Sequence, residues 1–209
     1  MSASPELRSF VQTIRDKNDI DYLTEDIGEI ISESKMGVER VKKIVEDLRS
    51  FSRLDESEIK NIDLGQNIKS ILTIIQSEIY KKNIHFNCST NEKIFLDCYP
   101  GQLNQAILNI IVNAIQAVDN GGEISLVIEE ISESICIIVT DNGIGMKGED
   151  MKKMFDPFFT TKPIGTGTGL GLSITYKIIH DLHKGNIEVE STINKGSIIK
   201  FIIPKEINK

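Results

Sequence analysis

DNGIGM (residues 141–146), FDPFFTTK (155–162) and GTGTGLGL (165–172) follow one another closely in the C-terminal half of the chain. The β-branched apolar run 135–140 predicts a strand that delivers Asp141 to a glycine corner. Glycines 167, 169 and 171 precede apolar residues spaced for the buried face of a helix. A glycine corner that opens a helix presents unpaired N–H groups to a polyphosphate. Either glycine cluster alone could belong to an ordinary flexible loop, but the two clusters in this order indicate a phosphate-binding site.

Two asparagines precede these motifs on a predicted helix. Asn109 and Asn113 lie four residues apart, so both amides project from one face. A single Asn there is more often a core or cap residue. Two amide oxygens, however, can share the octahedral shell of Mg²⁺ with water and phosphate oxygens. Asp141 can accept a hydrogen bond from an exocyclic amine, which distinguishes adenine from guanine. The pattern therefore predicts a purine triphosphate with its magnesium.

The order of the remaining elements predicts an α+β fold. Helices are expected at 64–80, 100–118, 148–154 and 169–183, and strands at 84–88, 94–98, 123–129, 134–141, 186–191 and 197–203. The stretch 155–168 holds two prolines and two glycines, which predicts a long irregular loop of the functional kind. Strands grouped together with helices to one side predict a two-layer α/β sandwich.

The N-terminal part of the chain is helical in pattern. A short apolar stripe at 7–14 predicts a short helix, and an uninterrupted amphipathic pattern predicts a long one over 20–55. The stripe of the long helix is Ile27, Ile31, Val38, Val41, Val45 and Leu48. We expect a second copy of the chain to bury this stripe, which predicts a homodimer through residues 20–55. The alternative is that the long helix folds back onto the second domain. The charged segment 53–61 predicts a boundary between a helical dimerisation segment (1–58) and a second domain (59–209).

Composition narrows the classes of function. A net charge of −7 argues against nucleic acid as a partner. No apolar run is long enough to cross a bilayer and no signal peptide is evident, so a cytoplasmic location is expected, either alone or as part of a larger receptor. Three widely spaced cysteines and three histidines form no metal signature and fit a reducing cytosol.

Residues 100–204 resemble the catalytic ATP-binding domain of bacterial sensor histidine kinases, in the Bergerat-fold (GHKL) superfamily that includes DNA gyrase. The resemblance rests on an N box (109–114), a first glycine box (141–145), an F box (155–162), a second glycine box (165–172) and a weaker last box at Gly196-Ser197. The helix at 20–55 resembles the second helix of that family's dimerisation and histidine-phosphotransfer hairpin. The resemblance implies a histidine kinase of two-component phosphorelay signalling, with a response regulator receiver domain as partner.

The same resemblance implies roles for individual residues, with ATP and Mg²⁺ as cofactors. Asp141 would read the adenine amine, and Asn113, helped by Asn109, would hold Mg²⁺. Loop 146–168 would be a lid over the nucleotide. The implied ATP-binding set is Asn109, Asn113, Asp141, Gly143, Gly145, Lys162, Gly167, Thr168, Gly169, Leu170, Gly171 and Ser197, and its catalytic members are Asn109, Asn113 and Lys162.

Two departures from the superfamily pattern shape the hypothesis. ATP-hydrolysing members carry a glutamate general base where this chain has Asn109, and an amide cannot accept that proton. The domain is therefore expected to hold ATP without rapid hydrolysis. In addition, no histidine precedes His85, whereas the family's acceptor lies on the first hairpin helix. His180 and His183 are interpreted as surface or cap residues.

The missing acceptor leaves several interpretations open. A truncated chain is favoured, and the alternatives are an acceptor on another protein or nucleotide binding alone. Correspondingly, three functions compete: a histidine kinase, a serine kinase of the same superfamily acting on a partner, and a switch module that binds nucleotide without transferring phosphate.

Overall fold

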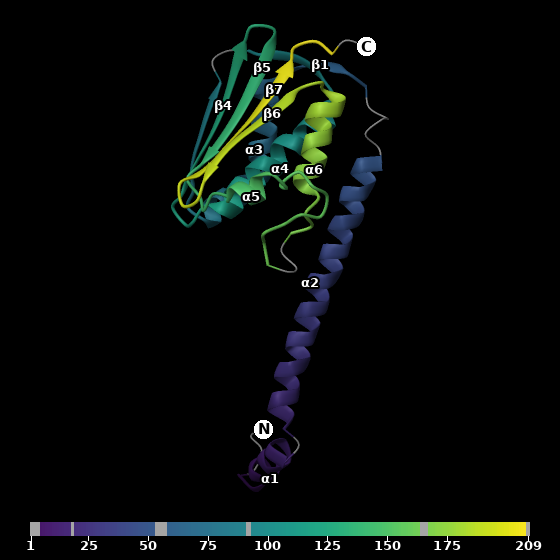
Figure 1. Cartoon of the computed structure of the whole chain (residues 1–209). Helices are drawn as coiled ribbons and strands as arrows, with labels where there is room; N and C mark the ends of the chain where they lie inside the picture. Colours follow the sequence, from purple (N-terminus) through teal and green to yellow (C-terminus); the bar gives the residue numbers. More distant parts are fainter. Residues whose placement is uncertain (1–4, 18, 53–57, 91–92, 164–166, 208–209) are drawn as a thin grey trace.

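The computed structural model describes residues 5–17, 19–52, 58–90, 93–163 and 167–207. The helical N-terminal part consists of α1 (Pro5–Lys17) and α2 (Ile20–Ser52), and α2 projects away from the rest of the molecule with α1 against its far end (Figure 1). The two helices predicted here are confirmed, except that positions 53–55 lie outside the described residues. In the described part of the chain no helix combines the length and apolarity that a membrane span requires.

Five strands form the main sheet, in the order β2-β4-β5-β7-β6. Only β2 and β4 run parallel; the other neighbours are antiparallel. The strands are β2 (His85–Thr90), β4 (Glu123–Ile131), β5 (Ser134–Asp141), β6 (Asn186–Thr192) and β7 (Gly196–Pro204). Helices α3 (Leu64–Lys81), α4 (Pro100–Ala117) and α6 (Gly171–Tyr176) cover one face (Figure 1), which confirms the predicted α+β two-layer sandwich. A short helix, α5 (Gly148–Met151), follows β5.

The alternation of the central strands produces the core. On β4 the alternate residues 124, 126 and 128 are buried, and on β5 the alternate residues 135, 137, 139 and 141 are buried together with Cys136. The alternating apolar side chains share the core with the apolar face of α4, where Leu103, Ile107 and Ile111 are fully buried. Because burial on one face stabilises a sheet of this kind, the helices lie on that face. Asp141, the last residue of β5, continues the buried alternation and so points from the end of this central strand toward the helix-covered face.

The sequence did not predict strand β1 (Lys60–Asp63), part of which lies in the segment interpreted as a charged boundary. It pairs antiparallel with β3 (Phe95–Cys98) in a separate two-stranded sheet. The ribbon is held by polar contacts: Asn61 Nδ2 donates to Asp97 Oδ1 at 2.7 Å. Asp63 then caps α3, its Oδ1 accepting from Gly65 N at 2.9 Å. A polar strand of four residues has no apolar alternation to reveal it.

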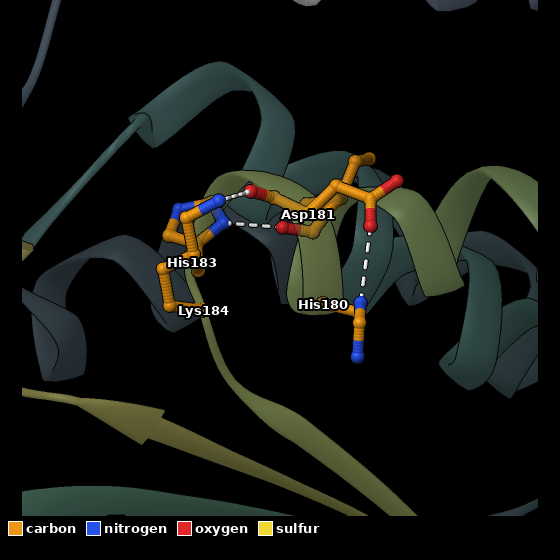
Figure 2. Close-up of polar contacts among 5 residues, drawn as sticks. His180, Asp181, His183 and Lys184 are labelled. Carbon is orange, nitrogen blue, oxygen red and sulfur yellow. Dashed lines mark hydrogen bonds and ion pairs between the residues drawn. The ribbon is translucent and has the colours of Figure 1, made fainter.

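The predicted helix 169–183 begins at Gly171 and changes character after Tyr176. Its last part is a π-helix, η2 (Lys177–Leu182), which ends at His183. The expectation of a surface or cap residue is confirmed: His180 is exposed, and His183 is the C-cap of η2, with a fully buried side chain. Tyr99 N donates to His183 Nε2 at 3.1 Å. The Nδ1 atom of His183 lies 2.7 Å from Ile178 O (Figure 2). The neutral ring with the proton on Nδ1 satisfies both contacts and joins η2 to the start of α4.

We expect the unfolding free energy to fall as the pH drops through about 6.5, the ordinary pKa of histidine. Burial lowers the pKa of His183, and its hydrogen bond to Ile178 opposes this only in part. The unfolded chain therefore binds more protons below pH 6.5, whereas the contribution of neutral His183 is fully present above it. Urea unfolding between pH 7.5 and 5.0 would show this slope, and a His183→Gln variant, which keeps both polar contacts without titrating, should show a shallower one. Equal slopes for the two proteins would contradict the assignment.

Candidate functional site

Three residues on one stripe of α4 contact the three sequence motifs. Asn109, Asn113 and Ala117 lie four residues apart, so they share a face of the helix. Asn109 bonds to Gly171, Asn113 accepts from Lys162, and Ala117 O accepts from Ile144 N at 3.1 Å. The glycine corner after β5, the lid and the start of α6 are thus all attached to one helix, as the sequence predicts for parts of one site.

Asp141 is buried at the end of β5, where its carboxylate is held by backbone groups. Its Oδ1 accepts from Gly143 N at 2.8 Å, and the backbone of Ser197 also hydrogen-bonds the carboxylate. Desolvation by burial raises the pKa of Asp141, and these two hydrogen bonds oppose the rise. At Gly143 an added Cβ would lie 2.5 Å from Ala117 O. The corner therefore requires glycine and presents a fixed acceptor.

Asn109 is anchored by its amide nitrogen. Nδ2 donates to Gly171 O at 3.0 Å and to Thr175 Oγ1 at 3.3 Å. These two bonds use both protons of the amide, so the acceptor Oδ1 is the group left for a ligand. The role of Asn109 as an oxygen ligand stays a prediction, and its amide has no group that could act as a general base.

Asn113 contacts the lid through its oxygen. Lys162 Nζ donates to Asn113 Oδ1 at 3.1 Å and also to Gln116 Oε1. Lys162 thus lies beside the amide to which the sequence assigns the metal.

The second glycine box packs against the F box. Gly169 has φ +68°, and an added Cβ would lie 2.4 Å from the backbone carbonyl carbon of Phe158. Phe158 also has a positive φ, +66°, which is unusual for a residue other than glycine. Leu170 is buried, and its N–H donates to Thr168 Oγ1 at 3.3 Å. At Gly167 an added Cβ would approach Thr160 Oγ1 to 3.0 Å. The close approach of backbone to backbone explains Gly169 without any ligand, whereas Gly167 faces only the Thr160 side chain.

Gly145 and Ser197 lie where the corner meets the β6–β7 hairpin. Gly145 has φ +65°, and an added Cβ would lie 2.0 Å from Thr192 O. Ser197 Oγ is 3.0 Å from Ser191 Oγ, which also accepts from Met146 N at 2.8 Å. These contacts attach the glycine corner to the β6–β7 hairpin. The ATP-binding roles of Gly145 and Ser197 remain predictions.

The side-chain oxygen atoms of the two asparagines suit a magnesium ion that is bound to nucleotide phosphates. Asn109 and Asn113 offer neutral, hard oxygen atoms, which Mg²⁺ accepts when phosphate oxygens and water complete its shell. Two neutral ligands alone hold Mg²⁺ weakly, which fits a metal that arrives with the nucleotide. The residues present therefore fit the metal–nucleotide pair.

Residues 98–207 match the family of histidine kinase-, DNA gyrase B- and HSP90-like ATPases. The chain belongs to this family. ATP is accordingly the nucleotide of the domain, and its sandwich is the catalytic ATP-binding domain of sensor histidine kinases. The isolated catalytic domain of the histidine kinase ThkA has a TM-score of 0.66 to this chain at 36% identity, over 71% of this chain and 96% of that domain.

Relatives extend the similarity beyond the ATPase domain. The chain is 31% identical over 200 residues to the signal transduction histidine-protein kinase AtoS of Escherichia coli (strain K12), which is 95% of this chain and 32% of AtoS. Sporulation kinase E of Bacillus subtilis (strain 168) is 29% identical over 97% of this chain and 27% of its own length. ThkA in complex with the response regulator TrrA gives a TM-score of 0.66 at 27% identity, over 99% of this chain and 53% of that one. The chain thus spans about a third or less of the two curated relatives.

Sequence reasoning missed two polar residues of the ATPase domain that touch the expected site. Gln116 accepts from Lys162, and Thr175 contacts Asn109. Gln116 lies three residues after Asn113, and Thr175 lies four after Gly171, so helical spacing from the predicted residues could have found both.

Proposed function

We propose that this chain is the ATP-binding catalytic portion of a sensor histidine kinase and transfers the γ-phosphoryl group of ATP to a histidine. The observation that carries the proposal is the stripe of α4, where two amides and the Asp141 corner attach to one helix together with the lid lysine. The relatives AtoS and sporulation kinase E are kinases by name. The response regulator bound to ThkA supports a receiver domain as the next partner. A reaction that consumes cellular ATP implies the cytoplasm as its compartment.

The contacts of the individual residues support the roles proposed for them. Asp141 accepts the adenine amine while Gly143 and Ser197 hold its carboxylate. Asn109 and Asn113 hold Mg²⁺ through their oxygens, and Lys162 leaves Asn113 to meet the phosphates. Magnesium bound with ATP would supply neutralisation of phosphate charge. No general base for water is present at Asn109, so the domain protects ATP for transfer by positioning it.

Phosphotransfer to an added acceptor tests this function. The chain is mixed with labelled ATP, Mg²⁺ and a separate histidine-bearing hairpin from a relative such as ThkA. Acid-labile, base-stable label on the hairpin, passed on to a receiver domain, is the expected result. Acid-stable label on serine would support the serine kinase instead, and ATP binding without any transfer would support the switch module.

We also propose that residues 1–58 form a dimerisation segment, separate from the catalytic domain 59–209. Five described residues of the α2 stripe are between 55% and 68% exposed in the single chain: Ile27, Ile31, Val38, Val41 and Val45. The sandwich therefore does not cover these five side chains, and a second copy would cover them. The ThkA complex matches this chain over both parts, which supports the hairpin interpretation.

Charge placed on the stripe should break the dimer. Val38→Asp is expected to convert a dimer to a monomer in sedimentation velocity at micromolar concentration, because a buried unpaired carboxylate is strongly unfavourable. Met36 is also exposed, at 61%, but lies about half a helical turn away, so Met36→Asp is the matched control. A wild-type monomer, or equal effects of the two changes, would contradict the proposed interface.

A further inference from the structure

We infer that Thr175 is a positioning residue that fixes the amide of Asn109 with its oxygen available to the nucleotide-bound metal. The inference rests on the proposed function and adds a residue to it. Thr175 lies on α6, is fully buried, and belongs to none of the sequence motifs. Its hydroxyl and the Asn109 amide meet at one carbonyl, that of Gly171.

The chemistry of these three groups leaves one arrangement of protons. Thr175 Oγ1 lies 2.8 Å from Gly171 O, and a carbonyl can only accept, so the hydroxyl proton points at it. Thr175 Oγ1 then has only lone pairs to offer its other neighbour. That neighbour, 3.3 Å away, is the side-chain amide of Asn109. It must therefore present its nitrogen, and the second amide proton goes to Gly171 O at 3.0 Å.

A flipped amide would place its oxygen against two acceptors. Without the Thr175 hydroxyl, Gly171 O would remain as a partner for one amide proton, and the second would lose its acceptor. The side chain would then rotate more freely and present either end to the metal. Since only the oxygen is a ligand for Mg²⁺, a disordered amide would weaken the metal-dependent part of ATP binding.

A neighbouring residue separates this role from simple helix packing. Ser173 is buried on the same helix, and its Oγ donates to Leu170 O at 2.9 Å, much as Thr175 donates to Gly171 O. Among the described residues, no hydrogen bond joins Ser173 to Asn109. Removing the Ser173 hydroxyl costs a comparable internal hydrogen bond and leaves the amide untouched, so Ser173→Ala is the matched control.

The first measurement needs no nucleotide. In wild type, nuclear magnetic resonance should show slow solvent exchange of the Asn109 side-chain amide protons, assigned by their disappearance in Asn109→Ala. Thr175→Val, which keeps the shape, should speed this exchange at least several-fold, and Thr175→Ser should restore the slow exchange. Thr175→Ala serves as a second removal if the valine variant fails to fold. Exchange in Thr175→Val as slow as in wild type would overturn the inference.

The second measurement is calorimetry of ATP binding with Mg²⁺ and with EDTA. Thr175→Val is expected to weaken Mg²⁺–ATP binding roughly tenfold, the factor for one hydrogen bond, with no change in EDTA. Thr175→Ser and Ser173→Ala should match wild type. If ATP binding depends on Mg²⁺ equally in wild type and in Thr175→Val, the role of Thr175 is wrong, while the proposed role of the metal stands. Wild-type binding without any Mg²⁺ dependence would overturn the proposed metal role together with the role of Thr175.

Discussion

Replacing Asp141 by Asn is expected to weaken ATP binding by about 10- to 100-fold without unfolding the domain. The carboxylate already accepts from the backbone of Gly143 and Ser197, and it has further lone pairs for the adenine amine. An asparagine has only one oxygen to share among these donors. Its NH₂ group would face a donor, so one hydrogen bond is lost and a repulsive contact takes its place.

Titration calorimetry with ATP and GTP would measure the effect. Because the new NH₂ group can donate to the oxygen that guanine carries at that position, the ratio of GTP to ATP affinity should rise in Asp141→Asn. Glu149→Gln removes the same charge from an exposed position on α5 and should bind ATP as wild type does. Unchanged ATP affinity in Asp141→Asn would contradict the assignment of Asp141 to the adenine.

The sandwich was predictable because its elements carry strong local signals. The apolar alternation of β4 and β5 and the stripe of α4 are patterns of burial, and burial is what determines these elements. β1 was missed since its four residues are held by polar contacts such as that of Asn61 with Asp97, which sequence periodicity does not record. The sequence predicted a helix here but not its π-helical end, and it could not predict that His183 at this end contacts Tyr99, a residue distant in sequence.

In the candidate site, too, the sequence predicted which residues belong together but not the contacts between distant segments. Glycine spacing and paired asparagines identified which residues belong together, since those residue types are limited by backbone geometry and by metal chemistry. The spacing could not show that Asn109 turns its nitrogen toward α6, or that Lys162 lies on Asn113. These contacts join segments separated by a loop, and their geometry comes from the packed fold. Helix α2 is a further case, because its pattern predicts a buried stripe without naming the partner.

Asn113→Ala is expected to lower phosphotransfer on the order of 100-fold and to remove most of the Mg²⁺ dependence of ATP binding. Asn113 Oδ1 contacts the lid lysine and is also the oxygen proposed to hold the metal. In Asn113→Ala, Lys162 loses its bond to Asn113 and keeps its bond to Gln116, and the metal loses a ligand. Asn113→Asp should also change the metal response, because a carboxylate binds divalent ions more strongly and pairs with the Lys162 ammonium when metal is absent.

Loss of the metal ligand must be separated from release of the lid lysine, and Gln116 allows this. Gln116→Ala removes the other Lys162 contact and leaves both amides in place, so its Mg²⁺ dependence should equal that of wild type. Calorimetric titrations of ATP over a range of Mg²⁺ concentrations compare the three proteins directly. If Asn113→Ala responds to Mg²⁺ as wild type does, the metal does not bind at Asn113. If Gln116→Ala loses the response as well, the lysine rather than the amide controls it, since release of Lys162 is the change that these two variants share.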